Sequence, residues 1–549
     1  MTVQEKYHQW LECPAMPEEL LSDLRLMDDD KMNDSFYRDL AFGTGGLRGV
    51  LGAGTNRMNF FTVLKATRGL GCYLKESFPS PSCAVSFDSR IHSDDFAKLT
   101  AAVLASEGIK VFLYPRLQPT PMLSFAVRYL HASGGVMITA SHNPARFNGY
   151  KVYGPDGCQI TLDAAKKIQG FIDLEPVPVD QIPSFEQYLS SGQISLIGDD
   201  TIEAYYQAMW KLRVRTVSEP LHLVYSPLNG TGNIPVREMM RRMGNIQVDI
   251  VSEQELPDGH FPTCPYPNPE IRDAMKLAID KTLETGADIC FATDPDCDRM
   301  GAGVRTGNSV ELISGNDMGI LMLDYLCRNA SVLSSRVVVK TIVTTEMAAA
   351  VCRKYGLELR NVLTGFKFIG EQIGLLESEG HPERFLFGFE ESYGYLSGTD
   401  VRDKDAVNAA ILLCDMAADL KLQGKTLVDR LGELRTEFGF YAQRLLTFEY
   451  EGEAGASRMS DIMSFLRQPL SAFSDRSLRD ASRTDYLNDE TGLPQSDVLE
   501  YQLSGDRKFI VRPSGTEPKL KIYLFAHGSD QVKAEKELDA LESLVSGLC

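Results

Sequence analysis

A serine at the end of an apolar run is the first residue in this sequence that could do chemistry. The apolar run at positions 136–138 stops abruptly at the small and polar residues TASHNP, positions 139–144, and a buried strand of this kind delivers its last residues to a crevice. A serine hydroxyl is a poor nucleophile unless a base, a metal ion or a pre-attached phosphoryl group assists it. We therefore take Ser141 as the candidate nucleophile and His142 and Lys151 as its candidate helpers. The alternative is a turn that only closes the strand.

Three carboxylates lie two residues apart in the run DPDCDR, at Asp294, Asp296 and Asp298. In an extended strand this spacing places them on one side of the chain, where they can share one hard divalent cation. Mg²⁺ suits such a set because it needs few protein ligands and leaves room for a substrate oxygen. A solvated acidic turn is the alternative. A calcium loop is disfavoured, because the glycine and glutamate of its twelve-residue pattern are missing.

Two further polar clusters could hold a substrate. Glu390, Glu391 and Ser392 follow an apolar run, and carboxylates there could accept hydrogen bonds from sugar hydroxyls, cap the next helix, or act as general acid and base. The run RPSGTEPK combines a guanidinium, two hydroxyls, an ammonium and a glycine, which together suit a phosphate dianion. Its residues are Arg512, Ser514, Gly515, Thr516 and Lys519. A plain Ser-Gly hairpin is the alternative for this run.

A glycine-rich stretch near the N-terminus could bind an anion as well. Glycines at 43, 45, 46, 49, 52 and 54 surround Arg48 and Arg57, so that backbone amides and guanidinium groups could converge. The alternative is a flexible turn.

The elements that position these residues alternate between helix and strand. Residues 1–40 are charged and predict helices. After them the pattern repeats in three cycles, which predicts βαβ units and mainly parallel sheets. In each cycle an apolar strand runs into a polar loop, so the three loops are expected to face one shared cleft. Residues from about 440 onward predict an α+β domain instead.

We therefore predict three α/β domains with mixed, mainly parallel sheets and a C-terminal α+β domain around a central active-site cleft. The expected domains are 1–200 with the serine loop, 201–314 with the aspartate loop, 315–440 with the glutamate loop, and 441–549 with the RPSGTEPK loop.

Composition narrows the function classes. A chain of 549 residues is too long to fold around a single hydrophobic core, so several domains are expected. Its content of 43% apolar and 24% charged residues is typical of a globular protein. The net charge of -19 argues against nucleic acid or a membrane surface as the main partner. The 11 scattered cysteines form no CxxC pair, and no segment is apolar enough to be a signal peptide or a membrane span, so we expect a cytoplasmic protein with reduced thiols.

These motifs together resemble the α-D-phosphohexomutase family of phosphoglucomutases and phosphomannomutases. ITASHNP with NGYKVYGPDG resembles its phosphoserine loop, DPDCDR its metal loop, GFEESYGY its sugar-recognition loop and RPSGTEPK its phosphate loop. Phe389 and Tyr393 make the chain more similar to the phosphoglucomutase-like and phosphopentomutase-like subgroup.

The resemblance implies a role for each candidate residue. Ser141 carries a phosphate and binds Mg²⁺ together with Asp294, Asp296 and Asp298. The residues that it places in contact with substrate are Arg299, Lys367, Glu390, Ser392, Lys404, Arg512, Ser514, Gly515 and Thr516. Arg48 is expected near the active site, and Lys151, ahead of His142, is the candidate for proton transfer.

The resemblance also implies the reaction: a phosphoglucomutase, an intramolecular phosphotransferase of the isomerase class, that interconverts α-D-glucose 1-phosphate and glucose 6-phosphate. It would pass through phosphoserine and glucose 1,6-bisphosphate, which also serves as activator. Alternatives are a phosphopentomutase, a phosphomannomutase or a hexose-bisphosphate synthase. A non-catalytic sugar-phosphate-binding relative would have lost the serine or an aspartate, and none is lost. We expect small sugar phosphates as ligands and a monomer or homodimer.

Overall fold

The computed structural model divides the chain into two compact units. It describes residues 1–43, 45–175, 181–450, 452–513 and 519–548. The first unit contains Met1–Met318 and Phe366–Gly424, and the second contains Gly319–Gly365 and Lys425–Cys549.

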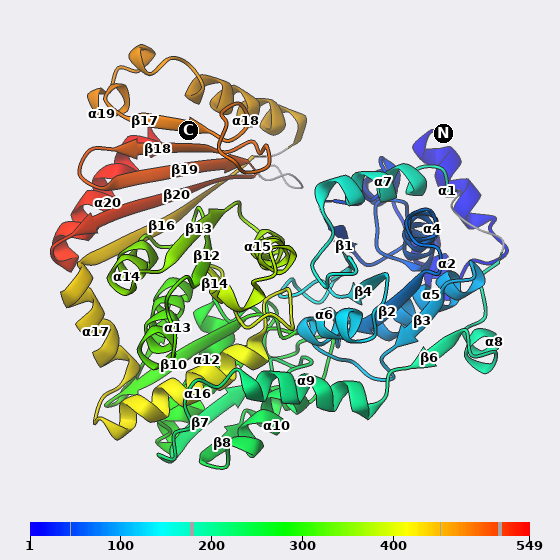
Figure 1. The fold of residues 1–549 in the computed structure, drawn as a ribbon. Helices are drawn as coiled ribbons and strands as arrows, with labels where there is room; N and C mark the ends of the chain where they lie inside the picture. The colour runs from blue at the N-terminus through cyan, green and yellow to red at the C-terminus, as the bar shows by residue number, and fades with distance from the viewer. Residues whose placement is uncertain (44, 176–180, 451, 514–518, 549) are drawn as a thin grey trace. The chain divides into compact units, whose positions relative to one another are not determined.

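The N-terminal part of the first unit forms a mixed sheet covered by helices (Figure 1). The strands are β1 (Gly46–Val50), β2 (Ser82–Phe87), β3 (Lys110–Leu113), β4 (Gly134–Ile138), β5 (Phe147–Tyr153) and β6 (Ile194–Leu196). The helices are α1 (Val3–Leu11), α2 (Glu18–Arg25), α3 (Asp29–Phe36), α4 (Phe60–Ser77), α5 (Ser93–Ser106), α6 (Thr120–Tyr129), α7 (Leu162–Ile172) and α8 (Phe185–Ser190).

The strand order in this sheet is β1-β5-β4-β2-β3-β6. Strand β2 pairs in parallel with β3 and β4, and β3 pairs in parallel with β6, while β5 runs antiparallel to both β4 and β1. The predicted βαβ units are therefore confirmed in the centre of the sheet. The glycine-rich stretch around Arg48 is a strand at the sheet edge, since β1 finds a partner in β5.

A second mixed sheet follows in the same unit, in the order β11-β10-β9-β7-β8. Strand β7 pairs in parallel with β8 and β9, whereas β10 pairs antiparallel with β9 and β11. The elements are α9 (Asp199–Lys211), β7 (Leu221–Ser226), α10 (Asn233–Met243), β8 (Ile246–Ile250), α11 (Ser252–Glu255), α12 (Arg272–Thr285), β9 (Ile289–Thr293), β10 (Met300–Thr306) and β11 (Ser309–Ile313).

The remaining part of the first unit carries the glutamate loop. Its elements are α15 (Phe366–Ser378), the 3₁₀ helix η1 (Pro382–Arg384), β14 (Phe385–Glu390), β15 (Gly394–Ser397) and α16 (Ala406–Leu422). Strands β14 and β15 form an antiparallel pair. The segment TGFKFIG, which the sequence pattern predicts as a loop, runs into the first turns of α15, because Phe366 and Ile369 recur at helical spacing and are both buried.

Three strands deliver the candidate loops, and each is buried along its whole length. These are β4 before Ser141, β9 before Asp294, and β14, which ends at Glu390. A fully buried strand is apolar on both faces, which is why it reads in the sequence as an uninterrupted apolar run. The predicted design of strand followed by polar loop is confirmed for all three.

The second unit contains a parallel strand pair and a wholly antiparallel sheet. Strand β12 (Val337–Thr341) pairs in parallel with β13 (Glu358–Val362). The other sheet has the order β16-β20-β19-β18-β17, and Figure 1 shows its five strands side by side. The α+β character predicted for the C-terminal domain is confirmed.

The antiparallel strands are β16 (Phe440–Glu449), β17 (Ser482–Asp485), β18 (Leu499–Leu503), β19 (Arg507–Pro513) and β20 (Lys519–Gly528). The helices of this unit are α14 (Met347–Tyr355), α17 (Leu427–Phe438), α18 (Gly452–Leu466), η2 (Leu470–Ala472), α19 (Arg476–Arg479) and α20 (Gln531–Ser546), and α13 (Gly315–Asn329) begins in the first unit and ends in the second. Among the described residues, none of the helices combines the length and the apolar character that crossing a bilayer requires.

Helix α1 packs onto the first unit through Trp10, which is 1% exposed. Its indole ring meets Phe36 and Phe61 edge-on, at centroid distances of 5.6 and 5.3 Å. We predict that Trp10→Ala destabilises the protein by about 3–5 kcal/mol, because it removes a large buried side chain. Trp210 is only half-buried, so Trp210→Ala should cost much less. Urea unfolding monitored by circular dichroism compares the two, and equal losses would contradict the prediction.

Candidate active site

The backbone at the candidate nucleophile is in an unusual conformation. After β4 ends, Ser141 adopts φ 51°, in the left-handed region that non-glycine residues rarely occupy. Its amide donates a 2.8 Å hydrogen bond to Thr139 Oγ1. Strained backbone of this kind persists only where the surroundings hold it, and it is common at functional sites.

The hydroxyl of Ser141 is buried and aimed at the aspartate loop. Ser141 Oγ donates to Asp294 Oδ2 at 2.8 Å and lies 3.3 Å from His142 Nδ1. Burial lowers the pKa of His142 well below its ordinary value, and the positive charges of Arg299 and Arg48 lower it further. His142 is therefore a neutral ring at neutral pH.

The three aspartates converge, although not in the way that the spacing suggests. We expected an extended strand, but residues 294–299 form a turn between β9 and β10. Cys297 has φ 53°, and its amide donates to the carbonyl oxygen of Asp294 at 2.9 Å. The expectation of an extended strand was wrong, because this local hydrogen bond and a left-handed residue reverse the chain.

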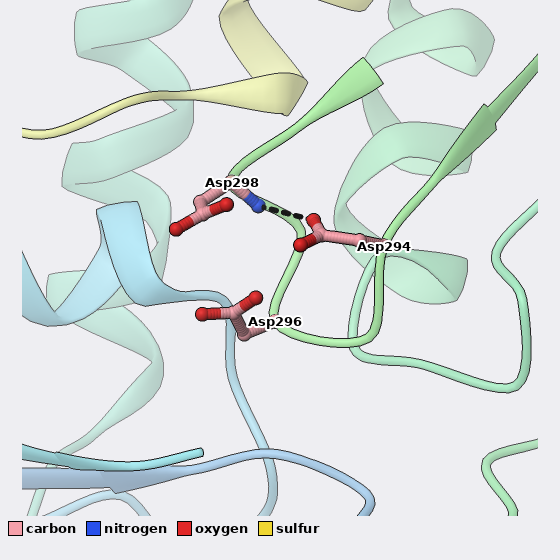
Figure 2. A group of neighbouring side chains, drawn as sticks. All are labelled: Asp294, Asp296 and Asp298. Atoms are coloured by element: carbon pink, nitrogen blue, oxygen red, sulfur yellow. Dashed lines mark hydrogen bonds between the residues drawn. The ribbon is translucent and has the colours of Figure 1, made fainter. Parts of the chain in front are cut away.

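Inside the turn the three carboxylates point toward one another, as Figure 2 shows. Asp294 Oδ1 accepts from the amides of Asp298 and Arg299 at 3.0 and 2.9 Å, which fixes that side chain. One oxygen from each aspartate lies within 4.8 Å of the other two. Among the described residues, the buried atoms Asp296 Oδ1 and Asp298 Oδ1 have no hydrogen-bond partner.

These features fit a divalent cation. Burial raises the pKa of Asp294 well above its ordinary value, and the charges of Asp298 and Asp296 add to the rise. Three carboxylates this close to one another repel when all are charged, and a cation between them would relieve that repulsion. Oxygen donors at this spacing suit a hard ion such as Mg²⁺.

Two lysines complete the charge balance at the aspartates. Lys151 Nζ, from β5, lies 2.7 Å from Asp296 Oδ2 and 3.3 Å from Asp298 Oδ2. Lys404 Nζ lies 3.2 Å from both Asp298 Oδ2 and Asp403 Oδ1. Burial alone would lower the pKa of each lysine, but the facing carboxylates outweigh it and raise both. Both side chains are charged donors here.

Two arginines of the predicted site lie at its margin. Arg48 Nη1 donates to Asn143 Oδ1 in the serine loop at 3.4 Å. Arg299 Nη1 donates to Glu270 Oε1 at 2.5 Å, and its Nε lies 3.8 Å from Asp298 Oδ1. Arg57 pairs instead with Asp34 of α3, so the structure does not bring both arginines of the glycine-rich stretch to the site.

The glutamate loop joins the aspartate loop through its backbone. The amide of Met300 donates to the Tyr393 carbonyl oxygen at 3.1 Å, and Arg299 forms an isolated antiparallel bridge with Gly394. Burial raises the pKa of Glu390 to about 7, although Lys404 opposes the rise. Ser392 lies in the turn after β14.

The other predicted contact residues are Lys367 and those in the RPSGTEPK run. Lys367 is in the first turn of α15, where its Nζ lies 5.2 Å from the Phe368 ring, and burial lowers its pKa. Arg512 lies on β19 of the second unit, opposite Lys521. Ser514, Gly515 and Thr516 lie outside the described residues.

Thr120, the first residue of α6, is a further residue of the site that was not predicted from the sequence. Its Oγ1 donates to Asp296 Oδ2 at 2.8 Å, and its amide donates to the Asp296 carbonyl oxygen at 2.9 Å. The signal was present, because Thr120 begins the helix that follows a predicted parallel strand, β3. The site thus combines two hydroxyls, three carboxylates that could bind a metal ion, and two charged lysines. Such a combination suits the transfer of a phosphoryl group.

Comparisons with known proteins agree with this geometry. Four family models match in chain order: phosphoglucomutase/phosphomannomutase alpha/beta/alpha domains I, II and III, over residues 39–176, 203–307 and 314–438, and the C-terminal domain, over 481–541. A phosphoglucomutase of Staphylococcus epidermidis is 34% identical over 533 residues, covering 94% of this chain and 96% of the relative. A phosphoglucomutase of Staphylococcus aureus is 35% identical over 510 residues, covering 90% and 91%.

Solved structures share the fold. The Paramecium phosphoglucomutase parafusin matches with a TM-score of 0.70 and 18% identity, over 93% of this chain and 95% of that one. A phosphoglucomutase/phosphomannomutase family protein of Burkholderia thailandensis matches with a TM-score of 0.68 and 18% identity, over 92% and 97%. On the four domain matches and the relatives above 30% identity, this chain belongs to the phosphoglucomutase/phosphomannomutase family.

Proposed function

We propose that the protein is a phosphoglucomutase that interconverts α-D-glucose 1-phosphate and glucose 6-phosphate. The observation that carries the proposal is the 2.8 Å hydrogen bond between Ser141 Oγ and Asp294 Oδ2, at the edge of a buried group of three aspartates. This arrangement supports a serine that carries a phosphoryl group next to a divalent cation. The phosphoglucomutases of the two Staphylococcus species support glucose phosphates as substrates.

In the proposed reaction, phosphorylated Ser141 gives its phosphoryl group to a free hydroxyl of the sugar monophosphate, and glucose 1,6-bisphosphate results. The bisphosphate turns over in the site, and its other phosphoryl group returns to Ser141. The same bisphosphate phosphorylates resting enzyme and so serves as activator. Mg²⁺ held by Asp294, Asp296, Asp298 and the serine phosphate would offset the charge of the transferring group.

The chain's own residues divide the remaining work. Lys151 is our first candidate for proton transfer and His142 our second. The charged Lys151 ammonium, 2.7 Å from Asp296, could give a proton to the oxygen from which the phosphoryl group departs, and the neutral His142 ring, 3.3 Å from Ser141 Oγ, could take up the proton of the attacking hydroxyl. Arg48, near the serine loop, adds positive charge. By family resemblance, we propose that a further set of residues binds the sugar ring and the non-reacting phosphate: Arg299, Lys367, Glu390, Ser392, Lys404, Arg512, Ser514, Gly515 and Thr516.

The first test compares the initial rates on glucose, mannose and ribose 1-phosphates with Mg²⁺ and a trace of the matching bisphosphate. We expect glucose 1-phosphate to have the highest kcat/KM, and Ser141→Ala to lower kcat by roughly 10⁴-fold or more, because the phosphoryl carrier is gone. A preference for ribose 1-phosphate would replace the substrate but keep the mechanism. A bisphosphate that accumulates in proportion to a second phosphoryl donor would instead identify a synthase.

The second test concerns Lys151. We expect Lys151→Met to lower kcat by about 10²–10⁴-fold, because it removes the candidate proton donor and the ammonium group that pairs with Asp296. Lys166→Met, at an exposed position of α7, is the matched control and should keep full activity. An active Lys151→Met enzyme would exclude Lys151 and leave His142 as the candidate.

The third test uses the titration of Glu390. Burial raises the pKa of Glu390 to about 7, so the side chain becomes protonated as the pH falls below that value. The protonated form is a weaker acceptor of hydrogen bonds from the sugar hydroxyls. We expect kcat/KM to fall about tenfold between about pH 8 and about pH 6, since the kcat/KM profile reports the free enzyme. Glu390→Gln should have low activity and should lack this inflection. An unchanged inflection in the variant would assign the titration to another group.

A further inference from the structure

The loop that carries Ser141 is bound by the side chain of Arg90. Four of its backbone carbonyl oxygens accept hydrogen bonds from the guanidinium of Arg90. Arg90 Nη1 donates to Pro144 O and Phe147 O, each at 3.0 Å. Arg90 Nη2 donates to Ser141 O at 2.5 Å and to Asn143 O. One planar group thus fixes the carbonyl positions around the strained serine.

Arg90 is itself held from the opposite side. Asp88, just after β2, places Oδ2 at 3.3 Å from Arg90 Nε, and neither side chain is exposed to solvent. Asp88 Oδ1 accepts from the Arg90 amide at 2.9 Å and from Ser93 Oγ at 2.7 Å. The ion pair therefore holds the guanidinium between Asp88 and the serine loop.

A third element covers the guanidinium. Arg90 Cζ lies 5.1 Å from the centre of the Phe261 ring, within the range of a cation–π contact. Phe261 belongs to the proline-rich segment between β8 and α12, which approaches closely at Gly259. A Cβ on Gly259 would lie 2.5 Å from the Ile91 amide nitrogen, so only glycine fits there. The Arg90 side chain is therefore enclosed, with none of its surface exposed to solvent.

From this geometry we infer that Arg90 is a positioning residue, which holds the Ser141 loop so that Ser141 Oγ meets the aspartates. The inference rests on the proposed function, in which Ser141 carries the phosphoryl group. Arginine suits the task because its rigid, planar donors match acceptors in one plane, whereas an ammonium offers three donors and no plane. Phosphoryl transfer depends mainly on positioning, so a displaced serine slows the chemical step.

The test measures single-turnover transfer from enzyme phosphorylated with glucose 1,6-bisphosphate to glucose 1-phosphate. We expect Arg90→Lys to lower the rate constant of transfer by about 100-fold. A variant that merely loses folded protein would show a smaller amplitude at an unchanged rate constant. The two effects are separate in one experiment.

Asp88→Asn is the second variant, for the case that Arg90→Lys does not fold. It keeps the side-chain size but removes the charge behind Arg90, and we expect a rate constant lowered about tenfold. Arg146→Lys is the matched control, since Arg146 is exposed on the same loop and should transfer at the wild-type rate.

The outcomes distinguish the two proposals. Ser141→Ala that still turns over glucose 1-phosphate would overturn the proposed function. An inactive Ser141→Ala, together with a wild-type rate constant in Arg90→Lys or in Asp88→Asn, would overturn the positioning role alone. Lowered rate constants in both variants, with Arg146→Lys unchanged, support it.

Discussion

Three buried carboxylates within 4.8 Å of one another are the constraint on which the rest of the first unit depends. Buried charges of one sign are strongly unfavourable unless cations or donors compensate them. The structure supplies these from separate places: Lys151 on β5, Lys404 before α16, Thr120 on α6 and Ser141 after β4. Ion pairs and hydrogen bonds to the aspartates therefore connect segments that are far apart in the chain.

Buried strands hold the loops that carry these residues. Each of the three loops leaves a strand that is buried on both faces, so its base cannot shift without opening the core. The glutamate loop is joined to the aspartate loop by backbone pairing between Arg299 and Gly394. Buried strands and paired backbones restrict the movement of the polar side chains, and phosphoryl transfer depends on such positioning.

Much of this could be predicted from the sequence. The βαβ units, the α+β C-terminal domain and the candidates Ser141, Lys151, Asp294, Asp296 and Asp298 follow from apolar runs that end in polar residues, and the structure places these five side chains together. Two local expectations were wrong, the extended aspartate run and the loop at TGFKFIG. A local backbone hydrogen bond reversed the chain at the aspartates, and buried apolar residues at helical spacing made TGFKFIG part of a helix.

The sequence by itself determined which side chains follow the buried strands. A strand buried on both faces is an apolar run, and the reactive polar residues come directly after it. Only the tertiary structure decided which atoms meet. Thr120 on Asp296, Lys404 on Asp298 and Arg90 on four loop carbonyls join residues far apart in the chain. No local pattern encodes such pairs, since they arise when separate strand ends are packed against one another.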